Sequence, residues 1–199
     1  LAAWYGPGMA DLHIAKGADV HARDGDGSTP LHLAAEANNV DGAKLLIANG
    51  AHPDAKDNHG ARPLHYAARQ GNQAVAELLL AAGAPVDAPD SRHRTPLYYA
   101  VRKDRADVVE TLLAHGPDPS AQDKWGWTAL HVAAWCRRPK ILKSLLAEDV
   151  NVHVNNSRGR TPLDVAELGY QLDAETERHD LLAKTRAVVE VLREHGRKE

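Results

Sequence analysis

The chain has 199 residues and a formal net charge of −3, so it is long enough to bury a substantial core and is nearly neutral overall. This charge excludes general attraction to nucleic acids or to anionic membranes. Aromatic residues make up only 5% of the sequence and alanine is its main apolar residue, which favours closely packed helices over sheets. The single cysteine, Cys136, excludes an internal disulfide and a multi-cysteine zinc site, and it agrees with a cytoplasmic location. No apolar run approaches the roughly 18 residues that a membrane-spanning helix needs.

One seven-residue pattern returns along the chain every 33 residues. It begins at Thr29 as TPLHLAA and starts again at Arg62, Thr95, Thr128 and Thr161. One position of the pattern is leucine in every copy and another is alanine: Leu31, Leu64, Leu97, Leu130 and Leu163, with Ala34, Ala67, Ala100, Ala133 and Ala166. This agreement indicates that each copy is the same structural unit of a repeat protein.

Each unit predicts two short helices followed by a turn. In the first copy, Thr29 is expected to cap a helix and Pro30 to occupy its first position, where the missing N–H has no cost. Leucine and alanine then recur on one face of that helix. In the second full repeat, residues 57–89, the second helix is expected to bury Val75, Leu78 and Leu79. Glycines are expected to end the second helices in the left-handed conformation: Gly50, Gly83 and Gly116.

The motif TPLHLAA, followed by LLIANGAHPDA at this spacing, resembles the ankyrin repeat, and the resemblance covers nearly the whole chain. It implies an all-α solenoid of stacked helix–turn–helix units with β-turn or hairpin fingers along one edge and a concave face that binds protein partners. The expected segments are a partial repeat, four full repeats and a C-terminal capping repeat with elongated helices: 1–23, 24–56, 57–89, 90–122, 123–155 and 156–199.

Both ends depart from the pattern. Leu1 to Trp4 (LAAW) matches Val132 to Trp135 (VAAW) with a slip of one residue, and the chain begins at Leu rather than Met. We therefore expect the sequence to begin inside the first helix of a repeat, with further ordered residues upstream. At the other end, a long charged stretch follows Thr161, which predicts an enlarged cap that shields the stack.

The residues with chemical potential do not form a recognisable active site. The resemblance implies that His32, His65 and His131 are structural and bond to neighbouring loops, and a spacing of roughly 10 Å between repeats would keep them from sharing one metal ion. His131 and Cys136 lie about 140° apart around a helix, so they do not face each other. Because there is also no GxSxG motif or glycine-rich phosphate loop, we expect no catalytic residue, metal site or cofactor.

Three tryptophans form the main departure from the repeat. The fourth full repeat has Trp125, Trp127 and Trp135 at the positions where the second full repeat has His59, Ala61 and Arg69. Trp135 is predicted to lie off the buried face, since it is about 140° around the helix from Leu130. Tryptophan, tyrosine and arginine are enriched in interface hot spots. The expected protein-binding residues are therefore the tryptophans and the basic and tyrosine side chains at related positions: Trp125, Trp127, Trp135, Lys124, Arg92, Arg94, Tyr99, Arg102, Lys103, Arg158 and Arg160.

Other interpretations of these positions remain open. Trp127 could fold over the neighbouring finger and Trp135 could cover the following turn, or the cluster could hold a small molecule. Nucleic acid is the main alternative partner for a surface of arginine and tryptophan side chains, because bases stack on aromatic rings. The acidic first repeat, with Asp26 and Glu36, and the modest number of basic residues favour a protein partner with an acidic surface instead.

The sequence therefore predicts a non-enzymatic protein-binding module with no nucleic-acid or membrane partner. One alternative is a stand-alone inhibitor, such as a bacterial immunity protein that neutralises a toxin. Another is the targeting segment of a larger enzyme encoded upstream. The excess of arginine over lysine and the richness in alanine favour a GC-rich bacterial source.

Overall fold

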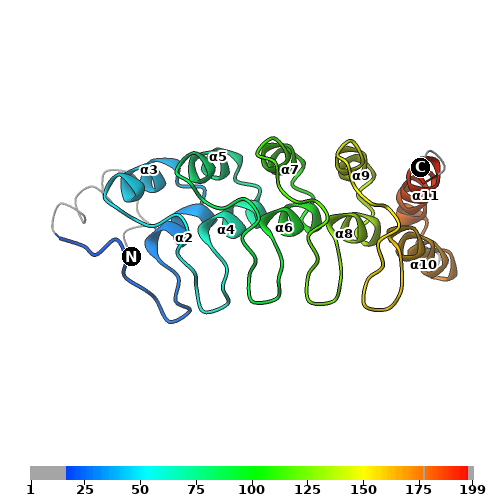
Figure 1. Ribbon diagram of the computed structural model, residues 1–199, viewed down its shortest axis with the longest axis horizontal. Helices are drawn as coiled ribbons and strands as arrows, with labels where there is room; N and C mark the ends of the chain where they lie inside the picture. The colour runs from blue at the N-terminus through cyan, green and yellow to red at the C-terminus, as the bar shows by residue number, and fades with distance from the viewer. Residues whose placement is uncertain (1–16, 177, 197–199) are drawn as a thin grey trace. The chain divides into compact units, whose positions relative to one another are not determined.

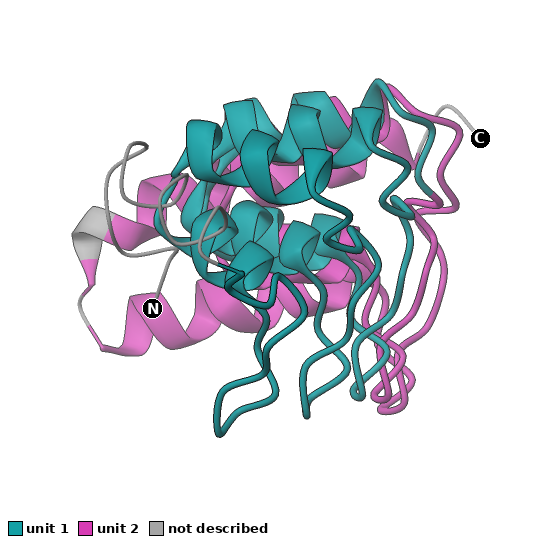
Figure 2. Ribbon diagram, turned by 90° about the vertical axis from the view of Figure 1, so that its left-hand side faces the viewer, with its two compact units in different colours: residues 1–117 teal, residues 118–199 magenta. Residues whose placement is uncertain are grey.

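The computed structural model describes residues 17–176 and 178–196, and these contain ten α-helices and no β-strand. The chain divides into two compact units, residues 1–117 and 118–199, which are described separately (Figure 2). The fold is thus all-α, as the repeat pattern predicts. The partial repeat expected before residue 17 lies outside the described residues.

The described residues of unit 1 contain three helix pairs that pack side by side. Helices α2, α4 and α6 form one row and α3, α5 and α7 form a second row (Figure 1). The bounds of these helices are Pro30–Glu36 (α2), Val40–Ala48 (α3), Pro63–Gln70 (α4), Gln73–Ala81 (α5), Pro96–Arg102 (α6) and Ala106–Leu113 (α7). Within the unit, each first helix packs on its own second helix, and α4 packs on both α2 and α6, so stability comes from contacts between neighbours.

The first helices begin where capping chemistry predicts. Thr29 precedes α2 with an extended backbone, and Pro30 occupies the first turn. The side chain of His32 accepts a hydrogen bond from the N–H of Thr29 at 3.0 Å, which satisfies a donor at the helix start. This bond between the residue before the helix and a side chain of its first turn fixes the direction in which the chain enters the helix.

The repeated leucine and alanine positions form the core of unit 1. Leu31, Leu64 and Leu97 are at most 1% exposed, and Ala34 and Ala67 are fully buried. Small alanine side chains allow the first helices to approach closely, while each leucine fills the space between neighbours. The columns that are constant in sequence are therefore the columns that pack.

The second helices bury a slightly different face from the expected one. In α5 the buried residues are Val75, Ala76 and Leu79, whereas Leu78 is only half-buried. Leu78 points about 100° away from the centre of the face that these three residues share, so it lies at the edge of the packed surface. The expectation that Leu78 belongs to the buried stripe was thus wrong in this detail.

The glycines after the second helices adopt the left-handed conformation. The φ angles of Gly50, Gly83 and Gly116 are 88°, 85° and 64°. A side chain is disfavoured at such angles, which explains why glycine recurs at this place in the repeat. The glycine positions expected from the sequence are confirmed.

Five turns, which we call fingers, lead into the first helices: residues 24–28, 57–61, 90–94, 123–127 and 156–160. In the second finger, one carboxylate oxygen of Asp57 accepts the N–H groups of His59 and Ala61, both at 2.8 Å. Aspartate or asparagine opens every finger in the same way. Neighbouring fingers in unit 1 are also joined, since the N–H of Ser91 donates to the carbonyl of His59 at 2.9 Å.

Unit 2 contains one ordinary helix pair and a larger pair at its C-terminal end: α8 (Ala129–Trp135), α9 (Pro139–Leu146), α10 (Pro162–Glu175) and α11 (His179–His195). The last two helices have 14 and 17 residues, compared with 7 and 8 in the first pair. Helix α10 packs against α8, and α11 packs against α9. Both helices after Thr161 are longer than those of the preceding pair, and their role as a cap stays a prediction.

A buried ion pair holds this last helix pair. The Arg137 guanidinium donates to both carboxylate oxygens of Asp173, each at 2.7 Å, and the hydroxyl of Thr185 donates to the same carboxylate at 2.7 Å. Asp173 is only 2% exposed. Arg137 itself has a φ of 58°, an unusual conformation for a residue other than glycine.

Candidate functional site

The expected binding residues fall into both units. Unit 1 contains the basic and tyrosine residues of the third repeat: Arg92, Arg94, Tyr99, Arg102 and Lys103. Unit 2 contains the tryptophans and their basic neighbours: Lys124, Trp125, Trp127, Trp135, Arg158 and Arg160. In each unit, part of the set lines a pocket: Arg92, Arg94 and Tyr99 in unit 1, and Trp127, Trp135, Arg158 and Arg160 in unit 2.

In unit 2, the fourth finger presents two tryptophans from a fixed backbone. One carboxylate oxygen of Asp123 accepts the N–H groups of Trp125 and Trp127 at 2.8 and 2.9 Å. The carbonyl of Trp125 accepts a further hydrogen bond from the N–H of Ser157 in the fifth finger, at 2.9 Å. The backbone is therefore satisfied without the indole rings, which are left free for other contacts.

The tryptophan side chains differ in exposure. Trp125 is 50% exposed and Trp135 is 42% exposed, whereas Trp127 is half-buried. The ring of Trp127 packs edge-on against Trp135 with centroids 6.2 Å apart, and it lies 5.9 Å from the ring of His131. Trp127 thus combines local packing with partial exposure. We call Trp125, Trp127 and Trp135 the tryptophan surface.

A pocket of about 290 Å³ adjoins this surface in unit 2. Its lining combines two indole rings with aliphatic and basic side chains: Trp127, Trp135, Asn156, Arg158, Arg160, Val165 and Leu168. An apolar hollow with a few polar groups at its edge is typical of a site that accepts one side chain of a partner. Trp125 is not part of the lining.

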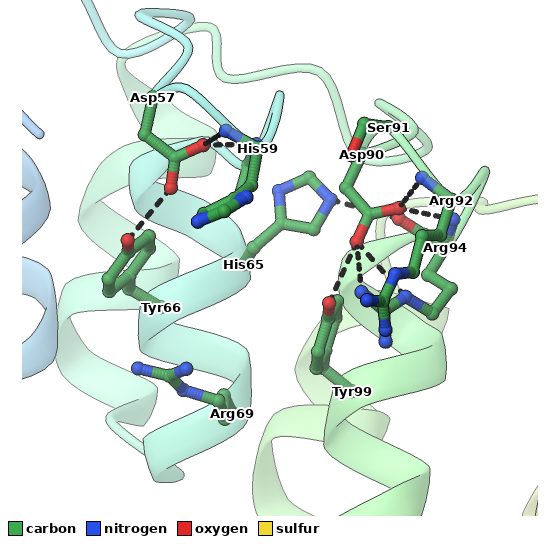
Figure 3. Close-up of a pocket in the computed structure, with 11 residues that line it drawn as sticks. Asp57, His59, His65, Tyr66, Arg69, Asp90, Ser91, Arg92, Arg94 and Tyr99 are labelled. Carbon is green, nitrogen blue, oxygen red and sulfur yellow. Dashed lines mark hydrogen bonds and ion pairs between the residues drawn. The ribbon is translucent and has the colours of Figure 1, made fainter. Parts of the chain in front are cut away.

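In unit 1, a second pocket lies between the second and third fingers, with helices α4 and α6 below them (Figure 3). Its volume is about 250 Å³. We call it the interfinger pocket. Its lining is polar and aromatic: Asp57, His59, Ala61, His65, Tyr66, Arg69, Asp90, Ser91, Arg92, Arg94 and Tyr99.

On the side of the third finger, Asp90 collects most of the donors around it. Its carboxylate accepts the Tyr99 hydroxyl at 2.7 Å and two N–H groups of the Arg94 guanidinium at 3.0 and 2.8 Å (Figure 3). Burial alone would raise the pKa of Asp90, but the hydrogen bonds to Arg94 and Tyr99 outweigh it and lower the pKa below its ordinary value. Burial and the bond to Asp90 raise the pKa of Tyr99.

Arg94 and Tyr99 are therefore engaged within the third repeat. The Arg94 side chain is 13% exposed, and its guanidinium carbon lies 4.8 Å from the centre of the Tyr99 ring. The structure assigns both side chains a packing role besides any contact with a partner. Tyr99 remains half-buried and lines the pocket with one face.

On the side of the second finger, Tyr66 repeats this arrangement. Its hydroxyl donates to Asp57 at 2.8 Å, and burial raises its pKa, although a hydrogen bond with Ser28 acts in the opposite direction. The guanidinium of Arg69 lies 5.0 Å from the centre of the Tyr66 ring and pairs with Glu36 at 2.8 Å. The pocket is thus bounded by two tyrosines held by two finger carboxylates.

The repeated histidines are structural in the described residues. The Nε2 atoms of His32, His65 and His131 lie 3.2, 3.1 and 2.9 Å from a carbonyl oxygen of the following finger. Burial lowers the pKa of His65 to about 4, although its bond to the Arg94 carbonyl opposes this change. Burial also lowers the pKa of His32 and of His131. Each imidazole therefore tends to remain neutral and to link consecutive repeats.

The remaining expected residues are exposed cations. Arg92, Arg102 and Lys103 are exposed in unit 1, and Lys124 and Arg158 are exposed in unit 2. Arg160, by contrast, is half-buried. Their positions agree with a role in recognition, and nothing in the fold of either unit requires a positive charge at the exposed ones.

Sequence reasoning missed the pairing of tyrosine with finger aspartate. Tyr66 and Tyr99 lie nine residues after Asp57 and Asp90, and this repeated spacing was the available signal. It also missed the contact of Arg137 with Asp173, for which no repeated spacing exists. Leu168, which lines the unit 2 pocket, occupies the same exposed column as Arg69 and Trp135, and this position was the available signal; Val165 was not singled out.

Within the described residues, no group of three or more His, Cys, Asp or Glu side chains is arranged to hold a metal ion. No helix in the same part of the chain is both long and apolar enough to cross a membrane.

Paired helices stacked by neighbour contacts, with turns leading into each first helix, define a helical repeat protein. A family model described as ankyrin repeats (3 copies) matches residues 1–90 and 97–174, and the chain belongs to the ankyrin-repeat family. Ankyrin repeats are generic protein–protein interaction modules and typically have no enzymatic activity. The family therefore implies a protein partner. A search of curated proteins found no match to the chain.

Proposed function

We propose that this chain is a non-enzymatic binding module that captures a protein partner on the tryptophan surface of unit 2. The observation that carries the proposal is the exposure of large apolar side chains. In the described residues these are Trp125, Trp135 and Leu172, and two of the three belong to the fourth repeat. Exposed indole rings beside a pocket are typical of an interface, because the partner buries them on binding.

The basic residues around this surface favour an acidic partner. Arg158 and Arg160 line the same pocket as Trp127 and Trp135, so a partner side chain that enters it also meets positive charge. Lys124, next to Trp125, is exposed as well. Complementary charge of this kind steers association and selects among partners, while the aromatic anchors supply most of the affinity. Arg92, Arg102 and Lys103 extend the proposal to unit 1.

A protein explains these residues better than a nucleic acid does. Binding along a phosphate backbone needs a track of roughly six or more cations, and its affinity depends strongly on salt. Arg94 is already paired with Asp90, and Arg69 with Glu36, so fewer cations are free than the sequence suggests. We accordingly propose neither a nucleic-acid nor a membrane partner, and we place the module in the cytoplasm, where its single cysteine would stay reduced.

The test is a capture experiment with the whole chain. The wild type and a Trp125→Ala/Trp127→Ala/Trp135→Ala variant are immobilised, and the proteins that each retains from a lysate are identified and quantified by mass spectrometry. Each truncated anchor is expected to cost about 2 kcal/mol of binding, so the variant should lose the partners that the wild type retains specifically.

Circular dichroism and urea unfolding must show that the variant is still folded. If a folded variant retains every wild-type partner, the assignment of the binding surface is wrong. A parallel Arg158→Gln/Arg160→Gln variant should slow association and weaken its dependence on salt, because it removes charge and leaves the tryptophans in place.

A further inference from the structure

The interfinger pocket contains a cation that no other group among the described residues of unit 1 engages. Arg92 is exposed in the third finger and lines the pocket. Its backbone N–H bonds to Asp90 at 2.7 Å, but its guanidinium makes no hydrogen bond or ion pair with the described residues of unit 1. An arginine fork with five unused donors is suited to a planar anion.

The carboxylates already in the pocket, Asp57 and Asp90, are not the anions that the Arg92 guanidinium binds. Asp57 accepts the N–H groups of His59 and Ala61 and the hydroxyl of Tyr66. Asp90 accepts two backbone N–H groups, the hydroxyl of Tyr99 and the fork of Arg94. Because both aspartates are satisfied by groups of their own repeats, Arg92 is available to an anion from outside.

The charge balance of the pocket indicates which anion fits. Three guanidinium groups line it (Arg69, Arg92 and Arg94) together with two carboxylates, Asp57 and Asp90, which leaves a single positive charge. Arg69 is paired with Glu36 and Arg94 with Asp90, so Arg92 is the lining guanidinium without an ion pair among the described residues. Its single charge suits a carboxylate, whereas a dianionic phosphate would meet repulsion from the two aspartates.

The shape of the pocket agrees with a single side chain. Its volume of about 250 Å³ lies below the usual range for drug-sized ligands. The rings of Tyr66 and Tyr99 provide apolar walls for methylene groups, while His59 and Ser91 stand with Arg92 on the fingers (Figure 3). A glutamate has this combination of apolar stem and charged end.

We propose that the interfinger pocket is a separate carboxylate subsite, which binds one acidic side chain of the protein partner through Arg92. The inference rests on the proposed function only in that the carboxylate belongs to a protein. The subsite and the tryptophan surface share no residue, and they lie in different units. Their tests can therefore succeed or fail independently.

The experiment is an NMR titration of the whole chain with small probes. N-acetyl-glutamate amide is compared with N-acetyl-glutamine amide, which has nearly the same shape without the charge, and with inorganic phosphate. The glutamate probe should shift the Arg92 side-chain signal and the backbone signals of residues 59 and 91–94, and the glutamine probe should not.

Matched variants locate the binding. Arg92→Gln should weaken binding of the glutamate probe by about tenfold, since it removes a charge-assisted fork. Lys44→Gln removes the same charge from an exposed residue of α3 outside the lining, and it should leave binding unchanged. The Trp125→Ala/Trp127→Ala/Trp135→Ala variant should also bind the probe as the wild type does.

Four results would overturn the proposal: equal binding of the glutamine probe, tighter binding of phosphate, unchanged binding in Arg92→Gln, or the same loss in Lys44→Gln. If the probe fails but protein capture still depends on the tryptophans, the subsite is wrong and the proposed function stands. If the probe binds and capture does not depend on the tryptophans, the subsite stands and the proposed function is wrong.

Discussion

Asp90 in the third finger and Asp123 in the fourth accept the same pair of backbone N–H groups, yet the side chains around them are used in different ways. In the third repeat, Arg94 turns onto Asp90 and is 13% exposed. In the fourth, Trp125 is 50% exposed and Trp135 is 42% exposed. The first residue of each finger satisfies the turn by itself, so the later positions are free to pack inward or to meet a partner.

The two units also differ in what stabilises them besides the leucine and alanine columns. Unit 1 uses polar contacts within each repeat, such as Tyr99 with Asp90. Unit 2 has a buried ion pair, in which Arg137, Asp173 and Thr185 join the turn after α8 to the last helix pair. This contrast predicts that unit 2 depends strongly on this ion pair, while unit 1 spreads its dependence over several polar contacts.

The largest effect is expected from Arg137→Ala. The substitution leaves Asp173 buried without its partner, and breaking such a pair costs about 3–5 kcal/mol. Urea unfolding followed by tryptophan fluorescence measures this loss. The control is Arg193→Ala, which removes a more exposed pair with Glu167 and should cost less than about 1 kcal/mol. Equal effects of the two substitutions would show that the network does not hold unit 2.

A pH effect is expected from His65 in unit 1. Its pKa falls from 6.5 to about 4 on folding, so between these values the unfolded chain binds more protons than the folded chain. The contribution of neutral His65 is therefore complete above pH 6.5 and is lost as the pH falls towards 4, by about 3 kcal/mol in total.

The measurement compares the free energy of unfolding of the wild type and of His65→Gln across this pH range. Their difference should change with pH in favour of the variant as the solution becomes more acidic, because glutamine does not titrate. A difference that stays constant from neutral pH to pH 4.5 would contradict the burial of a neutral imidazole at this position.

A smaller effect is expected from Tyr99→Phe. The substitution removes the hydroxyl that donates to Asp90 and keeps the ring, so it should destabilise the chain by about 1–2 kcal/mol. Tyr66→Phe removes the matching bond to Asp57 and should have an effect of similar size. Urea unfolding monitored by circular dichroism tests both. If neither variant loses stability, the tyrosines line the pocket for a ligand rather than for the fold.

The architecture could be predicted from the sequence because each repeat forms the same helix pair and turn from the same local pattern. Leucine and alanine at fixed spacing bury one face, and glycine at the end of the second helix supplies the left-handed turn. The exposure of Trp125 and Trp135 followed from helical phase and from comparison with His59 and Arg69 at the same positions. These inferences need only local geometry, which is the same in every repeat.

The contacts that the sequence did not predict join residues without a repeated relation. Arg137 and Asp173 are 36 residues apart, and their pairing depends on the elongated helices of the last pair. The engagement of Arg94 by Asp90 could not be anticipated either, because Trp127 and Arg160 occupy the same column and make no such pair. Side-chain direction at this position depends on the other residues of the same finger, since Arg94 follows Asp90, whereas Arg160 follows Asn156, which carries no charge.

The most direct test of the central claim replaces the fourth repeat's tryptophans with the second repeat's own residues. In Trp125→His/Trp127→Ala/Trp135→Arg, the finger keeps its backbone bonds to Asp123, so the variant should stay folded and lose no more than about 3 kcal/mol, from the packing of Trp127 against Trp135. Affinity for a purified partner that the wild type captures, measured by calorimetry, should fall by about a hundredfold or more. An unchanged affinity in this folded variant would contradict the claim that the tryptophan surface is where the partner binds.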